Sequence, residues 1–294
     1  MNEKNMFSDY AEFDTERPFD FSKRSSIGCG GRAKIAFYPR SISEMTELLA
    51  RLGQRGIAYQ VVGLLTNVLP PDGGTEKAII CTKKMTGVEI SDNKAFVLSG
   101  TTGTELLRTC RKSQKGGLEF LTGIPCTLGG VLFMNAGAGG TYIAESVESV
   151  LVYRSGQTLT LSLRDCKYGY KTSVFMENND VILGGTLRVF DSDERKISER
   201  EKSYRARRMH LPKGKSMGCV FKNPDGYFAG ELIERSGLKG LRVGDAKVSE
   251  LHGNFIINEG KATSKEIRTL ISLIKNAVFA QYGIMLKEEI RYLT

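Results

Sequence analysis

Short runs of β-branched and aromatic residues alternate with polar and glycine-containing segments over most of the chain. Such runs are typical of β-strands, because branched side chains pack well on a pleated surface. Helical patterns lie between the runs, so the sequence predicts an α+β fold. The predicted strands are residues 57–63, 78–81, 95–100, 149–155, 158–163, 181–190 and 254–258.

Apolar residues three and four positions apart predict four helices, two of which have a recognisable N-terminal cap. Ser41 and Glu44 form a capping-box pattern at the start of the first helix. Thr263 and Glu266 form the same pattern before the last helix, which is predicted to end near Gly283. The other two predicted helices are residues 104–115 and 227–236.

A charged, glycine-free stretch at residues 191–210 is the predicted junction between domains. With 294 residues, the chain is long enough for two or three folding units. Its composition of 40% hydrophobic and 26% charged residues is typical of a soluble globular protein. No apolar run of about 18 residues predicts a membrane span, and the polar, acidic N-terminus does not resemble a secretory signal.

The six cysteines are scattered, without a C-x-x-C pair. In a chain without an export signal this indicates reduced thiols in a cytoplasmic protein. The two histidines are too few and too isolated to predict a metal site.

The net charge of +9 is compatible with a nucleic acid or with an anionic small substrate. The densest basic stretch, residues 195–215, contains a single aromatic residue, Tyr204. This stretch is therefore interpreted as a solvated linker helix or a phosphate contact, and no nucleic-acid partner is expected.

Three glycine-containing segments would let the backbone approach a ligand closely. Residues 25–33 fit a dinucleotide-binding G-x-G-x-x-G/A pattern, but no strand precedes them, which weakens that interpretation. Residues 122–140 combine many glycines with a proline and an asparagine, and residues 61–74 lead from a strand into a turn. Both could present N–H groups to a pyrophosphate, or could be tight turns that need glycine for packing.

Cys219 lies shortly before Lys222 and Asn223, in the segment 215–240. A thiol beside a cation and an amide can donate a proton near an anion. A cysteine flanked by apolar residues is also common as a small buried side chain, so the residues alone leave both interpretations open.

In collinear order, seven segments resemble the UDP-N-acetylenolpyruvoylglucosamine reductase family. They are SSIGCGGRAKIAFYP, GLLTN, EFLTGIPCTLGGVLFMNAGAGG, YGYKTSVF, MGCVFKNPDGYFAGELIERSGLKG, KVSELHGNFIIN and LKEEIRYL. Together they extend over roughly residues 22–293. The chain lacks the family's longer insertion with a substrate-clamping tyrosine, so it resembles the shorter of the two family types.

The resemblance implies a two-lobed FAD-binding domain of the vanillyl-alcohol oxidase and cresol methylhydroxylase type, followed by a C-terminal α+β substrate domain. The expected boundaries are an N-terminal extension at 1–21, the FAD domain at 22–190 with lobes at 22–88 and 89–190, and the substrate domain at 191–294. The C-terminal tail is expected to return to the active site.

The implied reaction is the NADPH-dependent reduction of UDP-N-acetylglucosamine enolpyruvate to UDP-N-acetylmuramate, a step in peptidoglycan precursor synthesis. Hydride would come from flavin N5. The family's catalytic arginine, serine and glutamate fall on Lys171, Cys219 and Glu289, and Cys219 would then donate the proton. Lysine keeps the charge without the planar fork of arginine, and a thiol gives up a proton more readily than an alcohol.

Further positions are implied by the same matches. Leu64 and Leu65 stand where the family has glycines around the FAD pyrophosphate, and their side chains could block backbone approach. The implied cofactor-binding residues are Gly63, Leu64, Leu65, Thr66, Asn67, Thr122, Gly123, Ile124, Pro125, Gly129, Gly130, Asn135, Ala136 and Gly137. The implied substrate-binding residues are Tyr170, Lys222, Asn223 and Lys239.

The sequence leaves two alternatives open. One is a different flavoenzyme on the same flavin domain, which would not need the matches at 215–293. The other is a flavin-free homologue that binds nucleotide sugars, which the two leucines and Lys171 motivate. In the reductase interpretation the partners are the nucleotide sugar and NADPH, and the protein is expected to be a monomer.

Overall fold

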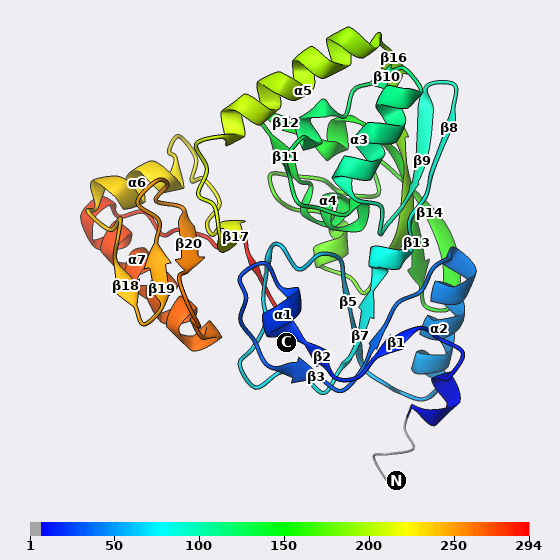
Figure 1. The fold of residues 1–294 in the computed structure, drawn as a ribbon, viewed down its shortest axis with the longest axis horizontal. Coiled ribbons are helices and arrows are strands. Elements are labelled where there is room, and N and C mark those ends of the chain that lie inside the picture. Colours follow the sequence, from blue (N-terminus) through cyan, green and yellow to red (C-terminus); the bar gives the residue numbers. More distant parts are fainter. Residues whose placement is uncertain (1–6, 294) are drawn as a thin grey trace. The chain divides into compact units, whose positions relative to one another are not determined.

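A computed structural model describes residues 7–293, which form two compact units (Figure 1). The first unit consists of the described residues up to Phe19 together with Lys34–Gly63 and Lys77–Ala206. The second consists of Asp20–Ala33, Leu64–Glu76 and the described residues from Arg207 onward. The functional boundaries expected at residues 22, 89 and 191 stay a prediction. Residues 1–6 of the expected extension and Thr294 lie outside the described range.

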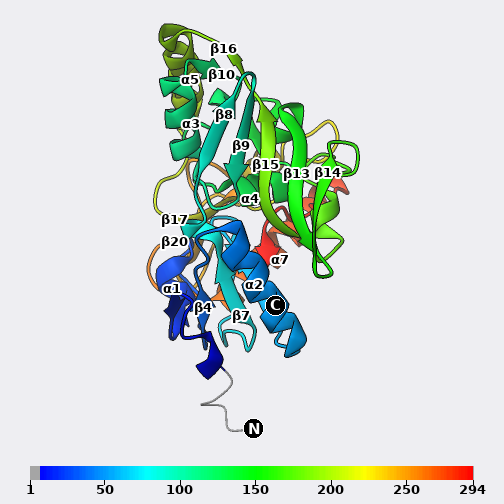
Figure 2. The same ribbon diagram turned by 90° about the vertical axis from the view of Figure 1, so that its right-hand side faces the viewer.

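A five-stranded antiparallel sheet forms one half of the first unit (Figure 2). Helices α3 (Gly103–Lys112) and α4 (Leu128–Met134) pack against it, and a buried apolar cluster fills the space between. Four of the predicted strands are found here, shifted by one or two residues at their ends. In sheet order the strands are β14 (Gln157–Ser162), β13 (Val147–Arg154), β15 (Val181–Arg188), β9 (Lys94–Leu98) and β8 (Val88–Ser91).

The other half of the first unit is a mixed sheet covered by helix α2 (Ile42–Gln54) (Figure 2). The predicted N-cap is confirmed, since the Ser41 side chain accepts a hydrogen bond from Glu44 N at 3.1 Å. The Glu44 carboxylate, however, accepts from Arg40 N at 2.8 Å. The strands are, in sheet order, β1 (Thr15–Glu16), β4 (Ala36–Phe37), β7 (Ala78–Cys81) and β5 (Tyr59–Val62).

Two short antiparallel pairs and helix α5 (Glu194–Arg208) complete the first unit. The predicted junction at 191–210 is mostly this helix, and the division between the units falls near its end, between Ala206 and Arg207. The short pairs are β10 (Lys115–Gly116) with β16 (Phe190–Asp191), and β11 (Gly137–Ala138) with β12 (Thr141–Tyr142).

The second unit is built on an antiparallel sheet against which helices α6 (Ala229–Arg235) and α7 (Ser264–Tyr282) form a common core. The capping box of α7 is confirmed in both directions, and Gly283 ends the helix at a φ of 69°. The sheet order is β17 (Lys215–Cys219), β20 (Phe255–Asn258), β19 (Ala246–Val248) and β18 (Arg242–Val243). The smaller elements are β2 (Phe19–Asp20), α1 (Phe21–Arg24), β3 (Arg32–Ala33), β6 (Val68–Leu69) and β21 (Arg291–Tyr292). Among residues 7–293, no helix is long and apolar enough to cross a membrane.

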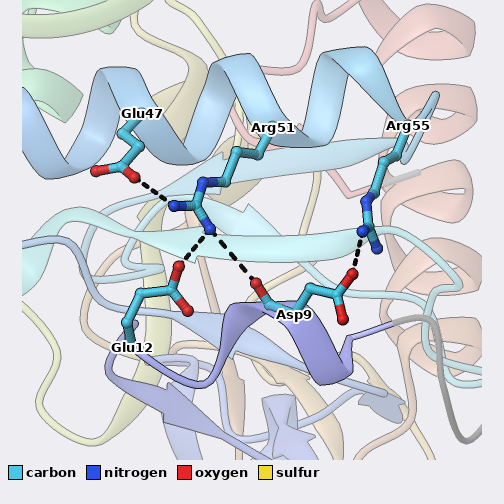
Figure 3. Close-up of polar contacts among 5 residues, drawn as sticks. All are labelled: Asp9, Glu12, Glu47, Arg51 and Arg55. Carbon is cyan, nitrogen blue, oxygen red and sulfur yellow. Dashed lines mark hydrogen bonds and ion pairs between the residues drawn. The ribbon is translucent and has the colours of Figure 1, made fainter.

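Two aromatic residues of the N-terminal segment are part of the first unit's core. Tyr10 and Phe13 are buried in the apolar cluster that α2 covers. Above them, Arg51 contacts Glu12 and donates to Glu47 Oε1 at 2.5 Å, while Arg55 pairs with Asp9 (Figure 3). All of these charged side chains are substantially exposed, so the buried rings are expected to hold the segment more strongly than the ion pairs.

A pair of substitutions at Tyr10 tests this interpretation. The ring is 1% exposed, and its hydroxyl finds no hydrogen-bond partner among the described residues. Tyr10→Ala is expected to lower the free energy of unfolding by about 3 kcal/mol, whereas Tyr10→Phe should leave it unchanged or raise it by about 1 kcal/mol. Urea unfolding measures both. A large loss in Tyr10→Phe would show that the hydroxyl is hydrogen-bonded.

Candidate active site

The C-terminal tail lies beside the segment that carries Cys219. Glu289 N donates to Val220 O at 2.8 Å, and Lys222 N donates to Lys287 O at 2.8 Å, around an antiparallel bridge between Phe221 and Glu288. The predicted proton donor and the predicted carboxylate therefore lie on adjacent hydrogen-bonded segments of the second unit. Both side chains are half-buried.

The loop at residues 64–67 contacts the same tail from another side. Asn67 Nδ2 donates to Glu289 O at 3.3 Å, and Arg291 N donates to Asn67 O at 2.9 Å, at the start of the parallel pair of β6 with β21. The backbone of Glu289 is thus fixed at its N–H by the Cys219 segment and at its carbonyl by Asn67. Sequence matching assigned Asn67 to the cofactor and did not indicate this contact.

Helix α7 also contacts the tail, through the side chain of Glu288. Glu288 accepts from Lys275 Nζ at 2.9 Å and from the Tyr292 hydroxyl. The Arg268 guanidinium lies over the Tyr292 ring at 4.3 Å. Burial, and next the hydrogen bond to Glu288, raise the pKa of Tyr292, so this hydroxyl stays protonated as a donor. Sequence analysis did not single out Lys275, Glu288 or Tyr292.

The two leucines of the predicted pyrophosphate loop differ in conformation. Leu65 has a φ of 54°, in the left-handed region that glycine adopts without strain. Its side chain is 4% exposed, and its carbonyl accepts from Ser26 N at 3.2 Å and from Ser26 Oγ at 3.3 Å. Leu64 is half-buried and has no positive φ. Leu65 therefore keeps a glycine-like backbone, and its side chain is buried.

Leu65→Gly measures the balance between this strain and the burial. Relief of the left-handed conformation is worth about 1–2 kcal/mol, but removal of a buried leucine side chain costs about 2–5 kcal/mol. We expect the variant to be less stable by about 1–3 kcal/mol in urea unfolding. A more stable variant would mean that backbone strain outweighs the packing of Leu65.

The predicted segment 122–140 contains helix α4, a helix that the sequence pattern did not predict. Thr127 caps this helix by accepting from Gly130 N, and it lies against the end of β5. A Cβ on Gly63 would be 2.5 Å from Thr127 Oγ1, so glycine is required for this approach. Gly129 N donates to Ser99 O at 2.8 Å, and a Cβ there would be 3.2 Å from the same residue.

Thr122 stands out among the remaining residues of this segment. It is 3% exposed, and its Oγ1 has no hydrogen-bond partner within residues 7–293. A buried hydroxyl of this kind is costly unless another group satisfies it. Its neighbours Gly123 and Pro125 are exposed, as is Gly130, whereas Ile124, Ala136 and Gly137 are half-buried.

Asn135 joins the end of α4 to the turn that carries Lys171. It ends the helix with a φ of 44°. Its Nδ2 donates to Gly169 O at 2.8 Å and its Oδ1 accepts from Ala144 N at 3.2 Å. Gly169 and Thr172 close a four-residue turn by reciprocal 3.2 Å hydrogen bonds, with Lys171 at a φ of 55° in its third position. A positive φ at this position is the requirement of a type II turn.

The predicted substrate-binding residues lie in both units. Tyr170 is 44% exposed and makes an edge-to-face contact with Tyr142 in the first unit. In the second unit, Asn223 Oδ1 accepts from Ala229 N at 3.0 Å, at the start of α6. Lys239 Nζ lies 2.7 Å from Glu234 Oε1, so its charge is already partly compensated. Lys171 belongs to the first unit, whereas Cys219 and Glu289 belong to the second.

Cys219 differs from most of the other thiols in its surroundings. Cys29, Cys81, Cys110 and Cys166 are buried, and only Cys126 shares the intermediate exposure of Cys219. Burial raises the pKa of Cys29 and of Cys110 to about 12 and that of Cys166 to about 11. These three thiols are protonated at neutral pH and react slowly. Among residues 7–293, no cluster of three or more His, Cys, Asp or Glu side chains could hold a metal ion.

Two family models match this chain, one in its N-terminal part and one in its C-terminal part. Residues 210–293 match the profile of the UDP-N-acetylenolpyruvoylglucosamine reductase C-terminal domain, and residues 33–162 match an FAD binding domain. A reductase of that name from Clostridium tetani is 35% identical over 272 residues, covering 90% of this chain and 88% of the relative. One from Clostridioides difficile is 36% identical over 275 residues, covering 92% and 90%.

A solved structure extends the likeness to the fold. The crystal structure of UDP-N-acetylenolpyruvylglucosamine reductase from Thermus caldophilus superposes with a TM-score of 0.83 at 29% identity, covering 96% of this chain and all of that one. Sequence and structure therefore agree over nearly the whole length. The chain belongs to the UDP-N-acetylenolpyruvoylglucosamine reductase family.

Proposed function

We propose that this protein is the FAD-dependent reductase that converts UDP-N-acetylglucosamine enolpyruvate to UDP-N-acetylmuramate, with NADPH as the reductant, in peptidoglycan precursor synthesis. The observation that best supports the proposal is the 2.8 Å hydrogen bond between Glu289 N and Val220 O, which joins the backbone of the tail to the segment that carries Cys219. Family membership supplies the reaction class. We further propose a cytoplasmic monomer.

Three features fit an FAD at the predicted positions. Leu65 adopts a left-handed backbone conformation that glycine reaches without strain. The unpartnered hydroxyl of Thr122 leaves a buried donor for a ligand oxygen. Gly63 and Gly129 permit close backbone approach around Thr127 and Ser99. We propose that residues 63–67, 122–125, 129–130 and 135–137 hold the cofactor, with Asn135 acting through the Lys171 turn. The match of residues 33–162 to an FAD binding domain and the family membership do not favour a flavin-free homologue.

The chemistry that FAD supplies when bound is the acceptance of hydride from NADPH and its delivery from N5 to the terminal vinyl carbon of the enolpyruvyl ether. Negative charge then develops at the neighbouring carbon and on the substrate carboxylate. The Lys171 ammonium stabilises this negative charge. A fixed cation does so more strongly where water is excluded. Glu289 is the second polar group assigned to the reacting carbon.

Cys219 completes the reduction by donating its thiol proton to the carbon next to the carboxylate. The double bond has then gained one hydride and one proton, and the lactyl ether of UDP-N-acetylmuramate is formed. NADPH loses the hydride, and the thiolate regains its proton from water. Tyr170, Lys222, Asn223 and Lys239 are assigned to the nucleotide-sugar substrate, where the lysines would neutralise the diphosphate.

Steady-state turnover tests the proposal. Purified protein loaded with FAD should oxidise NADPH only when the enolpyruvyl nucleotide sugar is present, and mass spectrometry should identify UDP-N-acetylmuramate in equal amount. NADH in place of NADPH tests the choice of reductant. NADPH oxidation without formation of the muramate would contradict the proposed function.

A further inference from the structure

Asn254 contacts the two residues that follow Cys219 through an unusually complete set of hydrogen bonds. Its side chain is buried, with 3% of the residue exposed, immediately before β20. Oδ1 accepts from Val220 N at 3.1 Å and from Phe221 N at 2.8 Å. Nδ2 donates to Phe221 O at 2.8 Å. One amide therefore satisfies three backbone groups of two consecutive residues.

Val220 N also donates to the Asn254 backbone carbonyl at 2.9 Å, whereas the hydrogen bonds observed for Phe221 N and O are those to the Asn254 side chain. The strand ladder is irregular here, so a side chain takes the place of a ladder partner for Phe221. Lys215 and Ser216 pair with Asn258 and Ile257, but the next pair is Cys219 with Phe255, which marks a register shift. Gly218 has a φ of 76° within the shifted segment. Bulges of this kind redirect side chains and are frequent next to active sites.

Asparagine is well suited to hold such a segment. Its amide combines an acceptor that can take two hydrogen bonds with an NH₂ donor, whereas aspartate offers acceptors only. A buried N–H or C=O group left without a partner costs about 1–3 kcal/mol. Removing the Asn254 amide would therefore allow the Cys219 segment to relax away from its observed path.

We propose that Asn254 is a positioning residue for Cys219, and that its amide clamps Val220 and Phe221 so that the thiol keeps its place for proton donation. Val220 O is also the acceptor for Glu289 N at 2.8 Å, so the same clamp fixes the tail that carries the carboxylate. The inference rests on the proposed role of Cys219. It assigns to the chain a residue that acts through the backbone without touching the substrate.

Asn254→Asp tests the clamp in FAD-loaded protein, because it keeps the side-chain shape and loses only the donor to Phe221 O. Anaerobic stopped-flow measures two steps, flavin reduction by NADPH and flavin reoxidation by the enolpyruvyl nucleotide sugar. We expect reoxidation to slow by about tenfold or more, while reduction stays within about twofold of wild type. Purely structural damage to the second unit would not separate the two steps in this way.

Alkylation of Cys219 by iodoacetamide provides a readout that does not depend on turnover. Peptide mass spectrometry distinguishes Cys219 from Cys126 and from the buried cysteines. A carboxylate at position 254 opposes formation of the thiolate, which is the reactive form. We expect the alkylation rate of Cys219 to fall by about fivefold in Asn254→Asp.

Asn258→Asp, at the other end of β20, is the matched control. Asn258 is 4% exposed, and its amide also bonds only to backbone in the contacts observed, donating to Ile27 O at 2.9 Å and accepting from Gly260 N at 3.0 Å and Ala262 N at 2.9 Å. We expect a comparable fall in thermal stability. Alkylation of Cys219 and the ratio of the two flavin steps should remain as in wild type.

The proposal is overturned if Asn254→Asp leaves both the reoxidation rate and the alkylation rate unchanged, or if Asn258→Asp changes them equally. If Asn254→Asp does not fold, amide hydrogen exchange in the wild-type protein replaces it. Protection of the Phe221 amide, which donates to Asn254 Oδ1, like that of core strands supports the clamp, and exchange at the rate of a free loop overturns it. Normal reoxidation in Cys219→Ala would instead remove the proposed proton donor, while the alkylation and exchange results still test the clamp itself.

Discussion

Cys219→Ala is expected to slow flavin reoxidation by the enolpyruvyl nucleotide sugar by about 10²-fold or more, because the variant lacks the proposed general acid for the second half of the reduction. Flavin reduction by NADPH should remain close to wild type, since no proton from Cys219 enters that step. Anaerobic stopped-flow absorbance follows each step separately. The difference between the two rates, rather than a fall in overall turnover, identifies the role of the thiol.

Cys219→Ser is the matched control for this experiment. It restores the residue type implied by the family and keeps an O–H donor of similar size. We expect its reoxidation rate to lie within about tenfold of wild type, well above that of Cys219→Ala. Reoxidation of Cys219→Ala at the wild-type rate would exclude Cys219 as the proton donor.

Lys171→Met is expected to reduce substrate-dependent reoxidation by about 10²-fold, because it removes the positive charge that we propose stabilises the developing enolate. Methionine is unbranched and of similar length, and it meets the same positive φ of 55° at this turn as lysine does. Folding should therefore change little, and stopped-flow measurement reports the loss of the charge.

Lys171→Arg provides the comparison for the charge itself. Arginine keeps the cation and adds a planar fork that can hold a carboxylate through two hydrogen bonds. We expect this variant to reoxidise its flavin at the wild-type rate or faster and to bind the substrate more tightly. Equal, severe losses in Lys171→Met and Lys171→Arg would mean that the position tolerates only lysine for steric reasons.

The regular elements of this fold could be predicted where local sequence determines them. Helix α7 has a capping box at Thr263 and Glu266 and a glycine at position 283, and all three features are found where they were expected. Strand β7 coincides with the apolar run at 78–81. In such segments the backbone and its nearest neighbours carry the information, so pattern and structure agree.

Helix α4 was missed because glycine and proline around it pointed to a loop. Its cap residues are of the types common at helix ends. Thr127 accepts a hydrogen bond from Gly130 N, and Asn135 ends the helix in the left-handed region. The grouping of Asp20–Ala33 and Leu64–Glu76 with the C-terminal residues was also not predicted. Contacts between segments that are distant in the sequence leave no periodicity that a local pattern could show.

In the candidate site, too, some residues could be predicted from the sequence and others could not. Cys219, Glu289 and Lys171 were found by matching family motifs position by position. The contacts that hold them, from Asn67, Asn135 and Asn254, depend on buried amides that meet backbone groups elsewhere in the chain. The sequence predicted that the Leu65 side chain could block backbone approach to a pyrophosphate. In the structure Leu65 has a positive φ and a buried side chain, and neither property can be read from the residue type.

The central claim is that this chain passes a hydride from NADPH to an enolpyruvyl nucleotide sugar through a bound flavin. The most direct test is the absorbance spectrum of the FAD-loaded protein under anaerobic conditions. We predict that NADPH bleaches the flavin bands and that one equivalent of UDP-N-acetylglucosamine enolpyruvate restores them, with UDP-N-acetylmuramate as the product. A protein that cannot be loaded with FAD, or a reduced flavin that the nucleotide sugar does not reoxidise, would contradict the account.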